Sequence, residues 1–305
     1  PQIQNIIPTA FFGTNTWAAP WLGTIGAVFI LIVGLAYLDW RRRRAAAADE
    51  GYGTQLVNEP EPFDAVKLPH PLIALLPLVL VGICNRLFTD LIPRAYGETQ
   101  SFLPSVVGNA KPVVQEVSKV AAIWAVEGAL LVGIICVLVF AWRAVAARFA
   151  VGSQAAVAGA LLASMNTASE YGFGAVIAAL PGFKLVADAL HTIPNPLVNE
   201  AVTVTALAGI TGSASGGMSI ALGAMADTFI HNANAAGIPM EVLHRIAAMA
   251  SGGMDTLPHN GAVITLLAVT GLTHRQSYKD IFAVTVIKTL AVAMVIGVYY
   301  AFGVV

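Results

Sequence analysis

Long apolar stretches separated by short polar ones run along the whole chain. Residues 18–38 contain no charged residue, begin beside Trp17 and Trp21, and end shortly before four consecutive arginines at 41–44. A helix needs about 20 apolar residues to cross the hydrocarbon core of a bilayer, and cytoplasmic ends are enriched in arginine and lysine. The pattern predicts a membrane-spanning helix whose C-terminal end lies in the cytoplasm.

Three further stretches have the length of a span, at residues 71–92, 120–142 and 281–305. The polar stretch 93–119 lies before the second of them and the polar stretch 273–280 before the third. Arg143 and Arg148 follow two crossings after the arginines at 41–44, so both basic clusters fit the cytoplasmic side. Residues 45–70 are rich in Ala, Asp, Glu, Gly and Pro, which predicts a polar linker and the clearest internal boundary. With the broken segments described next, we predict six to eight membrane segments.

After residue 149 the apolar pieces become interrupted. Residues 166–172 (Asn-Thr-Ala-Ser-Glu-Tyr-Gly) and Pro181-Gly182 divide the stretch 149–200. This predicts a helical hairpin or a broken span.

The same five residues, Ala-Ser-Gly-Gly-Met, occur at 214–218 and again at 250–254. Each copy lies between apolar half-segments, within 201–226 and 242–272, and the second is followed by Asp-Thr-Leu-Pro-His-Asn-Gly at 255–261. Glycine is a poor helix former, so both stretches predict a helix in two parts. Non-helical backbone at membrane depth is tolerated only where it is buried in protein or lines a cavity.

Broken helices bind anions in transporters, because half-helix N-termini present free N–H groups and a positive dipole end. Close packing of small residues would also explain the glycines, but it gives no reason for the polar residues beside them. We therefore predict that the cargo binds at the interruptions. The predicted residues are Asn166, Thr167, Thr211, Ser213, Ser215, Gly216, Gly217, Ser251, Gly252, Gly253, His259 and Asn260.

Two acidic residues, Glu170 and Asp255, lie in the predicted interruptions. Partial desolvation favours the neutral form of a carboxyl group, which makes proton exchange during a transport cycle feasible. We predict that these two residues couple transport to protons. His259 either contacts the cargo or caps the break. Other ionisable residues in apolar segments have simpler structural interpretations, and they are Glu127, Asp227, His231 and Lys288.

Composition agrees with a protein built for lipid. Of the 305 residues, 57% are hydrophobic and 11% are charged, against roughly 25% charged residues in soluble domains. The net charge is −1, with no basic surface for nucleic acid. Cys84 and Cys136 lie in apolar runs and indicate no disulfide. The sequence contains no spacing of metal ligands and no cofactor motif. A serine hydrolase using Ser213 or Ser215 with His259 stays open, but a nucleophile need not occur in duplicate.

Three stretches also resemble the gluconate permease family of the ion transporter superfamily. They are Pro-Gln-Ile-Gln-Asn-Ile-Ile-Pro at 1–8, Thr-Gly-Ser-Ala-Ser-Gly-Gly at 211–217, and Ser-Gly-Gly-Met-Asp-Thr-Leu-Pro-His-Asn-Gly at 251–261. The resemblance extends over essentially the whole chain. Members of this family carry gluconate and related hydroxy acids, including 3-hydroxybutyrate and D-serine, usually with protons.

The resemblance implies an all-α polytopic membrane protein, an inverted-repeat transporter of the elevator type with broken helices and re-entrant hairpins. It implies a homodimer in the bacterial inner membrane. Gln2, Gln4 and Asn5 would belong to the first repeat's half of the site. Family members are longer at the N-terminus, so we expect this chain to correspond to the C-terminal two-thirds of such a carrier.

Six regions are expected on this basis. They are residues 1–17 with the end of the first-repeat motif, a spanning helix at 18–40, a cytoplasmic linker at 41–70, scaffold helices at 71–148, a transport domain at 149–272 and a C-terminal helix at 273–305. The expected function is symport of a small anionic hydroxycarboxylate with protons. A sodium-coupled carrier or channel and an intramembrane enzyme are the alternatives.

Overall fold

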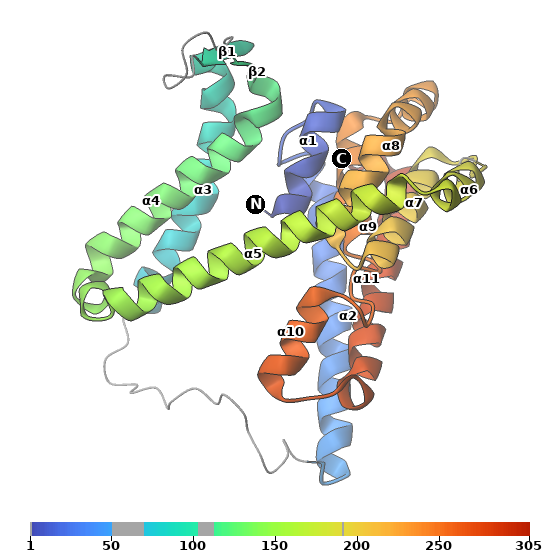
Figure 1. The fold of residues 1–305 in the computed structure, drawn as a ribbon. Helices are drawn as coiled ribbons and strands as arrows, with labels where there is room; N and C mark the ends of the chain where they lie inside the picture. Colours follow the sequence, from blue (N-terminus) through green and yellow to red (C-terminus); the bar gives the residue numbers. More distant parts are fainter. Residues whose placement is uncertain (1, 51–69, 103–112, 191) are drawn as a thin grey trace. The chain divides into compact units, whose positions relative to one another are not determined.

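The computed structural model describes residues 2–50, 70–102, 113–190 and 192–305, and Figure 1 shows their arrangement into elements. The regular structure of this described part is helical except for one antiparallel pair of strands, β1 (Thr99–Phe102) and β2 (Val113–Glu116). Most of the linker predicted at residues 45–70 lies outside the described residues.

Four helices in the described part are long and apolar enough to cross a membrane, judged by length and composition. They are α2 (Pro20–Ala47), α3 (Pro71–Tyr96), α4 (Val117–Ala147, with its apolar window from Val120) and α11 (His274–Phe302). These helices confirm the four long predicted segments. All four are longer than the predicted segments. In particular, α2 continues through the arginines at 41–44, and α11 includes the polar residues 274–280, with Thr273 as its N-cap.

The chain forms two compact units, which are described one at a time. The first contains Pro1–Trp17 and Phe63–Met165. Here α3 and α4 pack along each other and are joined through the β-hairpin, while η1 (Ile3–Asn5) leads into α1 (Ile7–Phe12), which packs on α4. The indole Nε1 of Trp17 donates a hydrogen bond to Oδ1 of Asn85 over 3.2 Å and links the N-terminal segment to α3.

The second unit contains Ala18–Pro62 and Asn166–Val305. Its centre is formed by α7 (Pro196–Thr211), α8 (Ala214–Ala235) and α9 (Met240–Ser251), which pack on one another. Large buried side chains fill the space between them, and these include Leu207, Met218, Leu222, Phe229, Leu243 and Ile246. A Cβ on Gly217 would lie 2.3 Å from the Cα of Ala208, so α7 and α8 meet backbone to backbone.

The two long helices of this unit, α2 and α11, run beside each other and also contact α9. Arg41 on α2 binds Asp280 on α11 through Nε over 2.7 Å and through Nη2 over 3.1 Å. The hydroxyl of Tyr37 donates to the same carboxylate over 2.7 Å. This bidentate pair fixes the register of the two helices at their polar ends.

One predicted interruption is wrong. Residues 166–172 lie inside a single helix, α5 (Phe149–Ala178), and not in a break. Asn, Thr, Ser and Glu each cost only a few tenths of a kcal/mol in a helix relative to alanine, and one glycine costs about 1 kcal/mol, so apolar flanks carry the helix through. The interruption at Pro181-Gly182 is confirmed, because α6 (Pro181–Leu190) begins there.

Candidate functional site: two helix breaks that meet

The first glycine-rich stretch interrupts the helix between α7 and α8, as predicted. Gly212 ends α7 in the left-handed conformation, with φ of +65°, which a residue with a Cβ adopts only at a cost. Ser213 is the N-cap of α8, and its Oγ accepts a hydrogen bond from the N–H of Gly216 over 3.1 Å. A Gly-Ser pair therefore stops one helix and starts the next within two residues.

The second stretch interrupts the helix between α9 and α10 (Gly261–Thr270), again as predicted. Asn260 is the N-cap of α10, and its Oδ1 accepts from the N–H of Val263 over 2.9 Å. Ser251 stays with its own helix, since its Oγ donates to the carbonyl of Ala248 over 2.9 Å. The residues between Ser251 and Asn260 form a series of turns.

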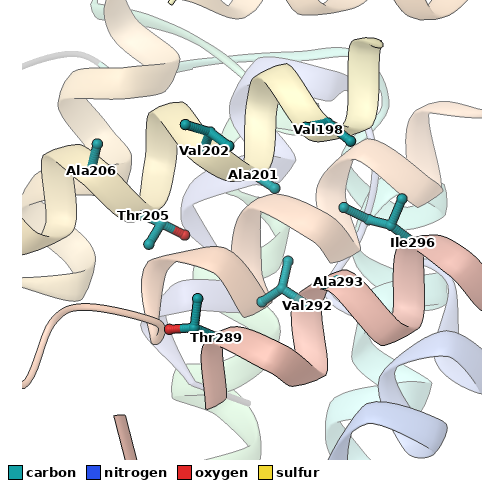
Figure 2. Close-up of a pocket in the computed structure, with 9 residues that line it drawn as sticks. All are labelled: Val198, Ala201, Val202, Thr205, Ala206, Thr289, Val292, Ala293 and Ile296. Carbon is teal, nitrogen blue, oxygen red and sulfur yellow. The ribbon is translucent and has the colours of Figure 1, made fainter. Parts of the chain in front are cut away.

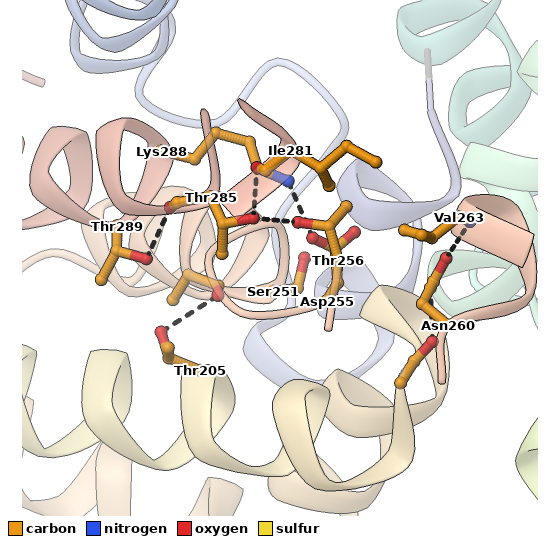
Figure 3. A network of polar contacts seen from close by, with 12 residues as sticks. Thr205, Ser251, Asp255, Thr256, Asn260, Val263, Ile281, Thr285, Lys288 and Thr289 are labelled. Carbon is orange, nitrogen blue, oxygen red and sulfur yellow. Dashed lines mark hydrogen bonds and ion pairs between the residues drawn. The ribbon is translucent and has the colours of Figure 1, made fainter. Parts of the chain in front are cut away.

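Three contacts bring the two breaks together within the second unit. The Nδ2 of Asn260 donates to the carbonyl oxygen of Gly212. Thr205 on α7 donates through Oγ1 to the carbonyl of Ala250 over 3.1 Å. A Cβ on Gly212 would lie 2.7 Å from Cδ2 of His259, so this imidazole rests against the first break. The N-termini of α8 and α10 consequently lie close together. Figure 3 shows Asn260 and its bond to Val263 at the start of α10.

The polar side chains at the breaks differ in exposure, and this separates their roles. Thr211, Ser213, Ser251 and Asn260 are buried. Thr211 donates through Oγ1 to the carbonyl of Leu207 over 2.8 Å, so it closes its own helix. Ser215 is half-buried, with its Oγ 3.5 Å from that of Ser213, and His259 is exposed. Ser215 and His259 are thus accessible to a bound molecule, as are the half-buried Asp255 and Thr256 of the second break.

One glycine of each repeat, Gly217 and Gly253, lies where a Cβ would meet neighbouring atoms closely. Gly216, Gly217 and Gly253 are buried and Gly252 is half-buried. A Cβ on Gly253 would lie 3.2 Å from Cγ2 of Thr205, and one on Gly209 would lie 3.1 Å from Cβ of Met254. These distances leave little room for larger residues, so close packing accounts for Gly209 and Gly253. The part of the glycines in binding cargo stays a prediction.

A third element, α11, contributes a cation beside the second break. Nζ of Lys288 lies 2.8 Å from Oδ1 of Asp255, and both side chains are about one-fifth exposed (22% and 20%). Thr256 and Thr285 share a hydrogen bond between their hydroxyls, as Figure 3 shows. The sequence assigned Lys288 only a structural part. Its distance of 33 positions from Asp255 hides the pair from any local pattern.

Next to this pair lies a cavity of about 510 Å³ between α2, α10 and α11. Its polar lining consists of Thr256, Thr270, Gln276, Ser277, Asp280 and Lys288. A volume of this size accommodates a small organic molecule. The cavity is continuous with residues of the second break through Thr256.

A second hollow has a different character. A groove of about 370 Å³ lies between α7 and α11. Figure 2 shows that the side chains lining it are almost entirely aliphatic. The hydroxyls of Thr205 and Thr289 are its polar groups among the lining side chains, and Thr205 is already bonded to Ala250. Such a lining does not suit a small anion, because a charge placed there would have no partner.

Six predicted residues lie outside the two helix breaks. Gln2, Gln4 and Asn5 belong to the first unit, at the start of η1. Asn166, Thr167 and Glu170 lie in α5, and their side chains are outside the described residues. The part of these six residues in a cargo site stays a prediction.

Comparison with known proteins adds one relative. No family model matches the chain, and no solved structure matches it. The chain is 55% identical over 314 aligned residues to the Bacillus subtilis (strain 168) protein named "Uncharacterized transporter YxjC". The alignment covers 100% of this chain and 66% of that relative, so the chain spans slightly less than two thirds of its relative's length.

Proposed function

We propose that the protein is a secondary active transporter that carries a small hydroxycarboxylate together with protons across the bacterial inner membrane. The observation that carries the proposal is the hydrogen bond from Asn260 to the carbonyl of Gly212, because it holds the N-termini of α8 and α10 side by side. Two helix N-termini at one place present several free N–H groups and two positive dipole ends to an anion. The similarity to a protein named as a transporter, which extends over the whole of this chain, supports a transport function.

In this proposal the cargo carboxylate binds at the two N-termini, and its hydroxyl groups bond to the reachable side chains, Ser215 and His259. Ser213 and Asn260 act as caps that fix the helix ends. Lys288 lies near the second break, where its charge is paired with that of Asp255. A neutral sugar would gain nothing from these dipoles, which is why the cargo class is an anion.

Protons are the proposed coupling ion. Glu170 and Asp255 are the coupling residues that the sequence suggests, and Asp255 is held by Lys288. The elevator movement, the homodimer and the division into scaffold and transport domains follow from the gluconate permease resemblance and complete the proposal. Gluconate, 3-hydroxybutyrate and D-serine are the first cargo candidates.

The test uses the complete protein in proteoliposomes. We expect uptake of radiolabelled gluconate or 3-hydroxybutyrate when the outside is acidic, and loss of accumulation when a protonophore collapses the gradient. Unlabelled hydroxy acids should compete, whereas neutral sugars of similar size should not. Accumulation that needs a sodium gradient and ignores pH would favour the sodium-coupled carrier. Absence of any hydroxy-acid uptake would refute the proposal.

The site itself is tested by Ser215→Ala, with Ser219→Ala one turn further along α8 as the matched control. We expect the first substitution to raise the KM for uptake and the second to leave it unchanged. Neither protein should convert the cargo into a product. Equal KM values for the two variants would show that the cargo does not bind at the first break.

A further inference from the structure

Glu200 is a buried acidic residue that the sequence pattern gave no reason to select. It lies one turn inside α7, a helix capped by Asn195 and starting at Pro196. Its side chain has 0% exposure. Neither carboxyl oxygen has a hydrogen-bond partner among the described residues.

Two neighbouring residues on α7 share this property. The Oγ1 of Thr203 and the Oδ1 of Asn199 are also buried without a partner in the described part of the chain. The amide of Asn199 is used, because its Nδ2 donates to the carbonyl of Leu190 over 2.8 Å and to that of Ile193 over 3.2 Å. Glu200 and Thr203 are three positions apart and so share one face of the helix. The carboxyl oxygens of Glu200, Oγ1 of Thr203 and Oδ1 of Asn199 are thus four buried oxygens without a hydrogen-bond partner among the described residues.

The apolar groove does not explain the cluster. At 100° per residue, Glu200 and Thr203 point to the side of α7 away from the groove residues Val198, Val202 and Thr205. Glu200 is therefore enclosed by protein on the opposite side of the helix.

The elements packed against α7 are α6, α8, α9 and α11. The ionisable residues they carry are Lys184 and Asp188 on α6, Asp227 and His231 on α8, Glu241, His244 and Arg245 on α9, and His274, Arg275, Tyr278, Lys279, Asp280, Lys288, Tyr299 and Tyr300 on α11. The side chains of the α6 pair are outside the described residues. Arg245 donates to the carbonyl of Ala18 and Lys288 binds Asp255. Among the described ionisable side chains, His244 is the other one with 0% exposure.

An ionised carboxylate in this place would be very costly. Transfer of an unpaired charge into a protein interior costs several kcal/mol even after relaxation, and such a group neutralises instead. Asp255 differs, because its carboxylate is ion-paired with Lys288 and is partly exposed. Glu200 has no ion pair to lose among the described residues.

We propose that Glu200 binds the coupling proton of the transporter. The inference rests on the proposed function and names the group that performs its proton step. In the described state the carboxyl is protonated, and release of H⁺ leaves a carboxylate when the cluster opens to water. The helix that carries Glu200 runs without interruption to Gly212, so movement at the first break displaces the cluster and links cargo binding to proton release.

The main test compares two modes of transport by the complete protein in proteoliposomes. Cargo exchange needs no net proton movement, whereas uphill accumulation does. We expect Glu200→Gln, which imitates the protonated form in shape, to retain exchange and to lose accumulation driven by a pH gradient. Glu241→Gln, an exposed position on α9, is the control and should behave like the unsubstituted protein.

Two results would overturn the proposal. One is full accumulation by Glu200→Gln. The other is separation of accumulation from exchange in Asp255→Asn or Glu170→Gln but not in Glu200→Gln. If the unsubstituted protein takes up no hydroxy acid, the proposed function fails instead. A second measurement does not need the cargo, since difference infrared spectra after a pH jump should show a carboxylic-acid C=O band that is missing in Glu200→Gln. An unchanged band in the variant would refute proton binding at Glu200.

Discussion

The side-chain amide of Asn260 links two helix breaks: its Nδ2 donates to the carbonyl of Gly212, while its Oδ1 caps α10. One residue thus supplies a hydrogen-bond donor to a carbonyl of the first break and caps the helix that follows the second. Both functions need an amide, because a carboxylate cannot donate and an alkyl side chain can do neither.

This relationship predicts that Asn260→Asp destabilises the protein and weakens cargo binding. The aspartate keeps the cap but loses the bond to Gly212 and places two acceptors against each other, at a cost of about 1–3 kcal/mol. We expect the cargo KM to rise about tenfold or more, equivalent to ~1.4 kcal/mol. Thermal unfolding in detergent and proteoliposome uptake measure the two effects.

Asn195→Asp is the control for this substitution. Oδ1 of Asn195 accepts from the N–H of Val198 over 3.0 Å and from the hydroxyl of Tyr300 over 3.1 Å. An aspartate can accept both bonds, so we expect a change within about 0.5 kcal/mol. Equal losses at the two positions would show that the effect comes from charge rather than from the lost donor.

A second prediction concerns the contact between α7 and α8. Gly217→Ala places a Cβ 2.3 Å from backbone atoms of Ala208, which cannot move aside as a side-chain end does. We expect the free energy of unfolding to fall by about 1–3 kcal/mol or more. Gly223→Ala, in the same helix with no atom within 4 Å, should be stabilising by a few tenths to about 1 kcal/mol. Thermal melts of the two variants should move in opposite directions, and a shared direction would contradict the packing.

A third prediction separates backbone strain from side-chain displacement at the first break. Gly212→Ala forces a Cβ into a left-handed residue and against the ring of His259. Gly303, at the end of α11, has φ of +64° and no atom within 4 Å of its Cβ position. Gly212→Ala and the control Gly303→Ala should each lower the free energy of unfolding by about 1 kcal/mol through backbone strain. Uptake should suffer in Gly212→Ala alone, and normal uptake by that variant would show that His259 has no part in binding.

A fourth prediction tests whether Asp255 and Lys288 act as a pair. Asp255→Asn and Lys288→Gln each leave one partly buried partner without its counter-charge. In a double-mutant cycle on thermal stability we expect a coupling free energy of about 0.5–3 kcal/mol, with the double variant less damaged than the sum of the single ones. Strict additivity would show that the contact contributes nothing to stability.

Local features of the sequence account for the helices and the breaks. The apolar lengths that predict α2, α3, α4 and α11 act through solvation of each segment by itself, and no distant contact is needed to recognise them. Gly212, Ser213 and Asn260 end or begin helices through bonds within four residues, which is why both breaks could be predicted. The same reasoning failed at residues 166–172, because weak helix formers inside a long apolar stretch lower helix stability without stopping it.

Tertiary structure decided what the breaks do together. The bond from Asn260 to Gly212 spans 48 positions and the ion pair of Asp255 with Lys288 spans 33. Glu200 stands at the polar edge of an apolar stretch, where a solvated acid is the ordinary expectation, and only packing of α7 against its neighbours removes it from water. The sequence by itself therefore determined where helices run and stop, because those choices depend on neighbours along the chain. Which helix termini lie side by side, and which acidic side chain is buried away from water, depends on neighbours in space.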